Sequence, residues 1–181
     1  MSPPTSVDSD TGYDWARDAD PLFTFLGLYL ATFQSIEGRL DQIILLGAGF
    51  EHWDETRDRL SQMDNRSKVD AATLTALDTE RFPMVAEIDG WSDRLEKIVA
   101  ELHEERRRRN GIMHSQYLME GLEHGLAAIR SSRTRRGADH PFDQEELVRP
   151  RMETILQEVA MLAFAIAQIH VQLIHAVGRE G

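Results

Sequence analysis

Residues 152–177 read METILQEVAMLAFAIAQIHVQLIHAV, and this stretch decides the fold class. Its apolar side chains recur every three or four positions, which is the spacing that places them on one face of an α-helix. The stripe consists of Ile155, Leu156, Val159, Leu162, Ile166, Ile169, Leu173 and Val177. We therefore expect a long helix that is buried along one side.

A second stripe with the same spacing lies near the start of the chain, beyond Pro21. Its members are Phe23, Leu26, Leu30, Phe33, Ile36, Leu40, Ile43 and Ile44. This pattern predicts another long helix, which ends near Gly47 or Gly49 because glycine readily adopts the left-handed conformation that follows many helices.

A third stripe follows Pro83, a residue that suits the first turn of a helix. It is formed by Ile88, Trp91, Leu95, Ile98 and Leu102. The predicted helix runs through a block of arginines to about Asn110, where Gly111 is a terminator or a kink.

The remaining segments give weaker signals. Short helices are predicted over residues 53–63 and 67–77, and Asp143 with Glu146 has the spacing of a capping box that begins a helix. Residues 115–130 fit either a frayed helix or a small hairpin, and residues 131–142 are expected to form an exposed basic loop. No alternating pattern indicates a strand. The prediction is an all-α fold, an up-down bundle of about four to five helices over residues 21–181, preceded by a disordered tail over residues 1–20.

The composition limits the chemistry. The chain has 181 residues, of which 41% are apolar and 28% charged, as expected for one globular domain. It has no cysteine, which excludes disulfides, thiolate metal sites and cysteine nucleophiles. No uninterrupted apolar run approaches the roughly 18 residues of a membrane span, and the N-terminus lacks the layout of a secretion signal. We expect a cytoplasmic protein without membrane contact or cofactor.

The charge is unevenly distributed. The net charge is −11, but residues 105–136 contain eight arginines and only three glutamates. A basic island in an acidic chain suggests a localised anionic ligand, because a groove that follows a nucleic-acid strand needs a wider basic stripe.

Several familiar catalytic and metal motifs are missing. The sequence that begins at His103 starts like a zinc-protease helix but lacks the second histidine, and no Glu-x-x-His pair, phosphate-binding loop or Gly-x-Ser-x-Gly elbow is present. His170 and His175 are five residues apart, so they do not point at one metal ion from a straight helix. We interpret both as histidines at the edge of the core.

The segment from Arg109 to His114, with Asn110 directly after the arginine, stands out from this background. It resembles the Arg-x(4–6)-His motif of HEPN domains, whose members often carry such a polar residue after the arginine. Arg135 and His140 match the same spacing but lie in the predicted loop. Arg109 instead continues the apolar stripe seven residues beyond Leu102, where a charge is costly to bury unless it meets a partner or a cleft. The order of the predicted helices also resembles the HEPN bundle.

The resemblance implies a metal-independent endoribonuclease of a toxin or defence system, in which two chains face each other as a homodimer. It assigns His114 as base or acid, Arg109 as the phosphate clamp and Asn110 as an orienting hydrogen bonder. An antitoxin protein is a further implied partner. The arginines expected to contact the RNA backbone are Arg106, Arg130, Arg133 and Arg135. In one HEPN subgroup the motif continues His-x-Tyr, whereas Gln116 occupies that place here, so control by modification of this tyrosine is not expected.

Alternative interpretations remain open. Glu105 lies four residues before Arg109, and Glu104 lies four before Arg108, which is the geometry of surface ion pairs on a helix end. On that interpretation His114 is only a hydrogen-bonded, partly buried residue. The chain would then be a non-catalytic HEPN-like bundle that binds a nucleotide or a partner protein, or a structural dimerisation module. Convergence of Arg109 and His114 within one chain also requires a bend at Asn110–Gly111.

Overall fold

The computed structural model describes residues 15–124, 126–133 and 142–177. These residues form five α-helices, three short 3-10 helices and a three-stranded antiparallel sheet. The helices are α1 (Trp15–Ala48), α2 (Trp53–Leu60), α3 (Asn65–Ala76), α4 (Trp91–Met113) and α5 (Arg149–Val177). The strands are β1 (Gln116–Leu118), β2 (Ala128–Arg133) and β3 (Phe142–Leu147), and the 3-10 helices cover Phe50–His52, Pro83–Glu87 and Leu122–His124.

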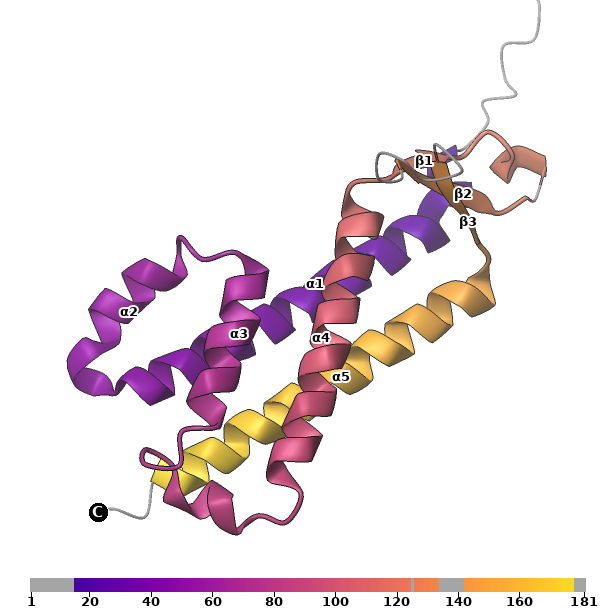
Figure 1. Ribbon diagram of the computed structural model, residues 1–181. Helices are drawn as coiled ribbons and strands as arrows, with labels where there is room; N and C mark the ends of the chain where they lie inside the picture. The colour runs from indigo at the N-terminus through magenta and orange to yellow at the C-terminus, as the bar shows by residue number, and fades with distance from the viewer. Residues whose placement is uncertain (1–14, 125, 134–141, 178–181) are drawn as a thin grey trace, which may run out of the picture.

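The long helices α1, α4 and α5 form the body of the molecule (Figure 1). Helix α1 packs along α5, α3 packs against α1 and α4, and α2 lies beside the end of α1. The sheet lies at the end of the bundle where α4 finishes and α5 begins. Because β1 follows directly after α4, the motif segment Arg109–His114 is at the junction between the bundle and the sheet.

One apolar core joins all the long helices, as the amphipathic patterns require. The predicted stripe of α5 is confirmed: Ile155, Val159 and Leu173 are among its fully buried side chains. In α4 the buried residues include Trp91, whose indole Nε1 donates to the carbonyl of Ala76 at 3.0 Å. The sheet joins this core through Ala128 and Leu147.

Helix α1 differs from its prediction in its start and in part of its buried face. It begins at Trp15 and contains Pro21, so its first turns lie within the range predicted as a tail, whereas residues 1–14 lie outside the described residues. Ala19 and Leu22 are already buried. The end at Ala48 agrees with the prediction. In the first half of the helix the buried positions are Leu22, Phe25 and Tyr29 instead of Phe23, Leu26 and Leu30.

The shorter helices are where the sequence places them, with shifted ends. Helix α3 begins at Asn65 and its cap is Asp64, whose side chain accepts from the backbone N–H of Ser67 at 2.7 Å. Pro83 begins a 3-10 helix, and α4 itself starts later, at Trp91. Helix α4 also continues past Asn110 to Met113.

The sheet contradicts the prediction of a purely helical fold. Within residues 115–130, β1 and the start of β2 form an antiparallel pair, which favours the hairpin alternative. The capping box predicted at Asp143 and Glu146 is wrong, because both residues lie in β3 opposite Ser132 and Ile129. Of the predicted loop over residues 131–142, the two ends belong to strands, and residues 134–141 lie outside the described residues. A single residue, Val148, separates β3 from α5.

One described helix, α5, is long and apolar enough to cross a bilayer when judged by length and composition alone. In its most apolar 18-residue window 39% of the residues are buried within the protein. Core helices of soluble proteins meet the same criterion, and α5 contributes nine buried residues here.

Candidate functional site

Helix α4 runs without a break through most of the Arg109–His114 motif. Gly111 is an interior residue of the helix, and the backbone N–H of His114 still donates to the carbonyl of Asn110 at 3.0 Å. The prediction that Gly111 ends or kinks the helix is therefore wrong, and the bend at Asn110–Gly111 that convergence of Arg109 and His114 requires is absent. On a straight helix, residues five apart differ in direction by about 140°, so Arg109 and His114 of one chain point toward different sides.

Arg109 occupies the inward-facing position that the stripe of α4 predicts. Its side chain is half-buried, and its guanidinium carbon lies 5.7 Å from the centre of the Phe33 ring, a cation–π contact with α1. Its Nη1 donates to Oδ1 of Asn110 at 3.2 Å. Its Nε is buried from solvent and has no hydrogen-bond partner among the described residues.

His114 follows the last residue of α4 and is exposed. Within the described part of the chain its imidazole accepts and donates no hydrogen bond. Asn110, one turn earlier, is also exposed. The imidazole is thus open to solvent rather than sealed among aliphatic groups.

Arg106 lies on the side of α4 that faces the start of α3. Its side chain is half-buried, and its Nε has no hydrogen-bond partner among the residues described. The pKa of Asp64 is lowered, first by the hydrogen bonds from Ser67 and also by the charge of Arg106. Arg106 and Arg109 are three residues apart and therefore lie on the same side of α4, and each has a buried Nε without a hydrogen-bond partner among the described residues.

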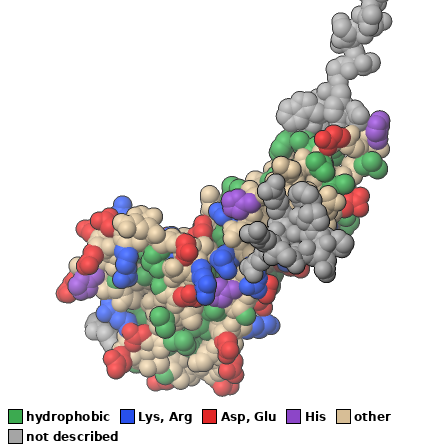
Figure 2. All heavy atoms as spheres, turned by 45° about the horizontal axis from the view of Figure 1, so that its top comes forward, with side chains coloured by type: hydrophobic (Ala, Val, Ile, Leu, Met, Phe, Trp, Pro, Cys, Tyr) green, Lys and Arg blue, Asp and Glu red, His purple; other side chains and the backbone are tan. Residues whose placement is uncertain are grey.

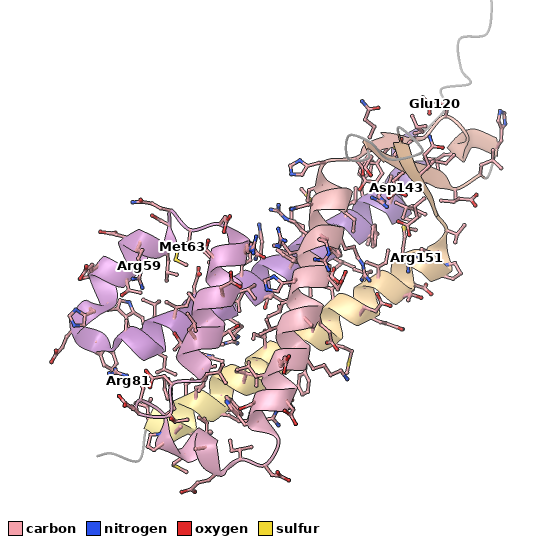
Figure 3. All side chains as sticks on the ribbon, in the orientation of Figure 1. Arg59, Met63, Arg81, Glu120, Asp143 and Arg151 are labelled. Carbon is pink, nitrogen blue, oxygen red and sulfur yellow. The ribbon has the colours of Figure 1, made fainter. Side chains whose placement is uncertain are left out.

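Arg130 is held within the sheet instead of being free for a ligand. Its side chain is 11% exposed, its Nε donates to Glu145 at 3.1 Å, and its Nη2 lies 3.5 Å from Asp143. Glu145 also accepts from Nε of Arg151 at 2.7 Å, and its pKa is lowered by these arginines against the effect of burial. Figure 3 labels Asp143 and Arg151 at this junction of sheet and helix.

The side chains of the other two arginines predicted to bind RNA are not described by the structure. Arg133 is the last residue of β2, and its side chain lies outside the described part. Arg135 lies wholly outside the described residues. Of the two predicted RNA contacts whose side chains are described, Arg106 lies beside Arg109 on α4, and Arg130 lies close to Gly111 of the motif but is held by Glu145.

The most buried polar group near the motif is Glu105, for which the alternative interpretation predicts a surface ion pair. Glu105 is 5% exposed and accepts a hydrogen bond of 2.6 Å from the hydroxyl of Tyr29. Arg108 lies 3.0 Å from Glu105 and 2.7 Å from Glu158 of α5. Burial, then the hydrogen bond to Glu105, raises the pKa of Tyr29.

The predicted ion pairs are shifted by one position. The structure pairs Glu104 with Arg107 and Glu105 with Arg108, each three residues apart, instead of Glu104 with Arg108 and Glu105 with Arg109. A signal for Glu105 exists in the sequence, since it lies three residues after Leu102 in the buried stripe. Its burial leaves Arg109 without a carboxylate partner on its own helix.

The surface around the motif carries both signs of charge. On the face shown in Figure 2, basic and acidic side chains alternate and do not form a continuous basic stripe. No group of three or more histidines and carboxylates suited to a metal ion occurs in the part of the chain that the structure describes. His170 lies at the core edge as predicted and is 8% exposed, with Nδ1 3.3 Å from Arg39, whereas His175 is exposed.

Comparisons of the chain with protein-family models, curated proteins and solved structures found no match. The case for a function therefore depends on the residues themselves.

Proposed function

We propose that the protein is a HEPN-like ribonuclease that cleaves RNA without a metal ion and acts as a symmetric homodimer. The observation that carries the proposal is the composition of the end of α4. An exposed imidazole, His114, lies within five residues of Arg109, a half-buried guanidinium that has no carboxylate partner among the described residues. Asn110 holds that guanidinium through its side-chain oxygen.

These residue types suit cleavage through the ribose 2′-hydroxyl. The 2′-oxygen attacks phosphorus, the bond from phosphorus to the 5′-oxygen breaks, and a cyclic phosphate and a 5′-hydroxyl result. One imidazole accepts the proton of the 2′-hydroxyl and a second protonates the departing 5′-oxygen, which suits a group with an ordinary pKa of about 6.5. Arginine stabilises the charge on the phosphoryl oxygens with paired donors.

The need for a second chain follows from the unbent helix. One chain supplies one His114, while the reaction uses an acid and a base. Because Arg109 and His114 of one chain diverge, a phosphate held by Arg109 meets a histidine more readily if a partner chain supplies it. A two-fold axis near the end of α4 brings both motifs to one cleft.

We place this activity in the cytoplasm, in a toxin or defence system, with an antitoxin protein as a further partner. The engagement of Arg130 by Glu145 favours a second candidate, a non-catalytic HEPN-like bundle that binds a nucleotide or partner protein, because it removes one cation from RNA contact.

The test is cleavage of single-stranded RNA by the purified protein in EDTA. We expect cleavage by the wild type, with His114→Ala and Arg109→Ala inactive and equally folded by circular dichroism. His52→Ala and Arg149→Ala are matched controls, since both side chains are exposed on other helices, and they should retain activity. Cleavage that survives His114→Ala refutes the assignment, and absence of cleavage with nucleotide binding lost in Arg109→Ala supports the second candidate.

Mixing experiments test the shared site. If each cleavage needs both His114 side chains, an equal mixture of wild type and His114→Ala after subunit exchange retains about a quarter of the activity, because only a quarter of the dimers have two wild-type chains. Retention of half of the activity shows instead that each chain works alone.

A further inference from the structure

The outer face of α5 carries an apolar surface that the fold does not cover. Met161, Phe164 and Val171 are 68%, 60% and 48% exposed. They are spaced by three and seven residues, so they lie on one side of the helix, opposite the buried stripe. No Asp, Glu, Lys or Arg occurs between Val159 and Val177.

A hollow of about 660 Å³ lies beside this surface, between α4 and α5. Its apolar lining includes Met161, Leu162 and Ala165 from α5. This volume is within the range of about 300–1,000 Å³ found for ligand clefts. It is large enough to accept apolar side chains of a partner.

The rim of the hollow is acidic. Four glutamates line it, and its one cation, Arg108, is bound by two of them, Glu105 and Glu158. The other two are Glu101 and Glu104, both exposed on α4. Glu104 forms an ion pair with Arg107, while Glu101 forms no ion pair within the part of the chain that the structure describes. A ligand that matches this surface therefore has an apolar side and a positive charge.

We propose that the α4–α5 hollow and the outer face of α5 bind a basic amphipathic helix of a partner protein. Apolar residues of that helix enter the hollow beside Met161, and its lysines or arginines pair with Glu101 and Glu104 at the rim. This is the helix-in-groove mode of recognition, with charge complementarity selecting the partner. The proposal concerns a surface separate from the RNA site and does not depend on the proposed ribonuclease activity.

Charge also decides against the two other occupants of an apolar helix face. A second copy seated on this face brings its own acidic rim, so like charges meet across the two-fold axis. An anionic lipid surface is repelled by the same glutamates.

The experiment uses two synthetic peptides and fluorescence anisotropy. One is an amphipathic helix of leucine and lysine, and the other has glutamate in place of lysine. We expect the wild-type protein to bind the lysine peptide, and to bind the glutamate peptide at least about tenfold more weakly. Met161→Glu should weaken binding of the lysine peptide by about tenfold, because Met161 lies at the centre of the proposed interface. Glu101→Lys should also weaken it by about tenfold, because it places a positive charge at the rim opposite the lysines of the peptide.

Matched controls separate this surface from general attraction to an acidic protein. Leu74→Glu changes a leucine on α3 that is 73% exposed, and Glu55→Lys makes the same charge change on α2. Both should bind like the wild type. Equal weakening by a control and its matched variant overturns the proposal.

Two further measurements address the competing occupants. Light scattering shows whether Met161→Glu turns a dimer into a monomer, which would mean that a second copy covers this face. If the wild type co-sediments with vesicles of phosphatidylcholine and phosphatidylserine and Met161→Glu does not, a lipid surface covers this face. Either result overturns the proposal, whereas RNA cleavage by the same variants reports separately on the proposed function.

Discussion

Replacing Tyr29 with phenylalanine tests whether the buried contact between α1 and α4 stabilises the bundle. The hydroxyl of Tyr29 is 2.6 Å from Glu105, and the two residues are 0% and 5% exposed. Water therefore cannot replace the lost donor, and a hydrogen bond to a charged group contributes about 1.5–3 kcal/mol. We expect Tyr29→Phe to lower the free energy of unfolding by about 2 kcal/mol, or Tm by about 4–8 °C for a chain of this size.

Urea denaturation followed by circular dichroism measures this change. Tyr117→Phe is a matched control, because the Tyr117 hydroxyl is half-buried and donates at 2.7 Å to an uncharged acceptor, the carbonyl of Ile112, and it should cost only about 1 kcal/mol. A double-mutant cycle with Glu105→Gln should reveal coupling between the two side chains. Equal costs for the two tyrosines, together with no coupling, would refute the reasoning.

The pH dependence provides an independent check on the same contact. Burial and Glu105 raise the pKa of Tyr29 above its ordinary value of 10.0. Above pH 10 the unfolded tyrosine ionises while the folded one stays neutral, so the stabilisation is complete below pH 10 and is lost as the pH rises. Tyr29→Phe should make stability decline less steeply in alkaline solution, and an unchanged slope would contradict this assignment.

Three further predictions concern the edge of the core and the junction with the sheet. The pKa of His170 is lowered by burial and then by Arg39, so the unfolded chain binds a proton at this imidazole more readily than the folded chain does. Stability should therefore fall as the pH drops below the ordinary pKa of 6.5. The denaturation midpoint of His170→Gln should fall less over the same pH range. Arg130→Gln leaves Glu145 with Arg151 as its remaining cation and should cost about 1–2 kcal/mol, with faster amide exchange in β2; unchanged exchange argues against a structural role. Gly111→Ala brings a methyl group to 3.0 Å from the flexible end of Arg130 and also removes a poor helix former. Stability should therefore change by no more than about 1 kcal/mol, and RNA cleavage should persist. Loss of cleavage with an intact fold would show that the motif needs a bend at Gly111.

The long helices could be predicted from periodicity, but the buried face of α1 could not be predicted throughout. In the segment PLFTFLGLYL, which covers residues 21–30, apolar residues point in nearly every direction around a helix. Two stripes are then equally regular, and only tertiary packing selects Leu22, Phe25 and Tyr29, with α5 beside Phe25 and Glu105 of α4 bonded to Tyr29.

The sheet could not be predicted from an apolar pattern, because oppositely charged side chains face each other across its strands β2 and β3. Strands β2 and β3 read AIRSSR and FDQEEL, which lack the apolar alternation of a typical half-buried strand. Their register places Arg130 directly opposite Glu145. Arg130 and Glu145 are fifteen residues apart in the sequence, so their pairing is not visible in a short segment. The local spacing of Asp143 and Glu146 predicts a helix start instead, and that prediction is wrong.

At the candidate site, the inward position of Arg109 could be predicted from the stripe of α4. The continuation of the helix through Gly111 could not, since glycine permits either conformation. The burial of Glu105 cannot be predicted from the ion-pair spacing on α4 alone, because its partner is the hydroxyl of Tyr29 on α1.

The short connection at Val148 has a mechanical consequence. Since β3 passes into α5 through one residue and Arg151 donates to Glu145 across that connection, the junction has little freedom to bend. Strand β3 and the first turn of α5 should move as one rigid body, so that a displacement of the strand by a ligand also displaces the start of α5.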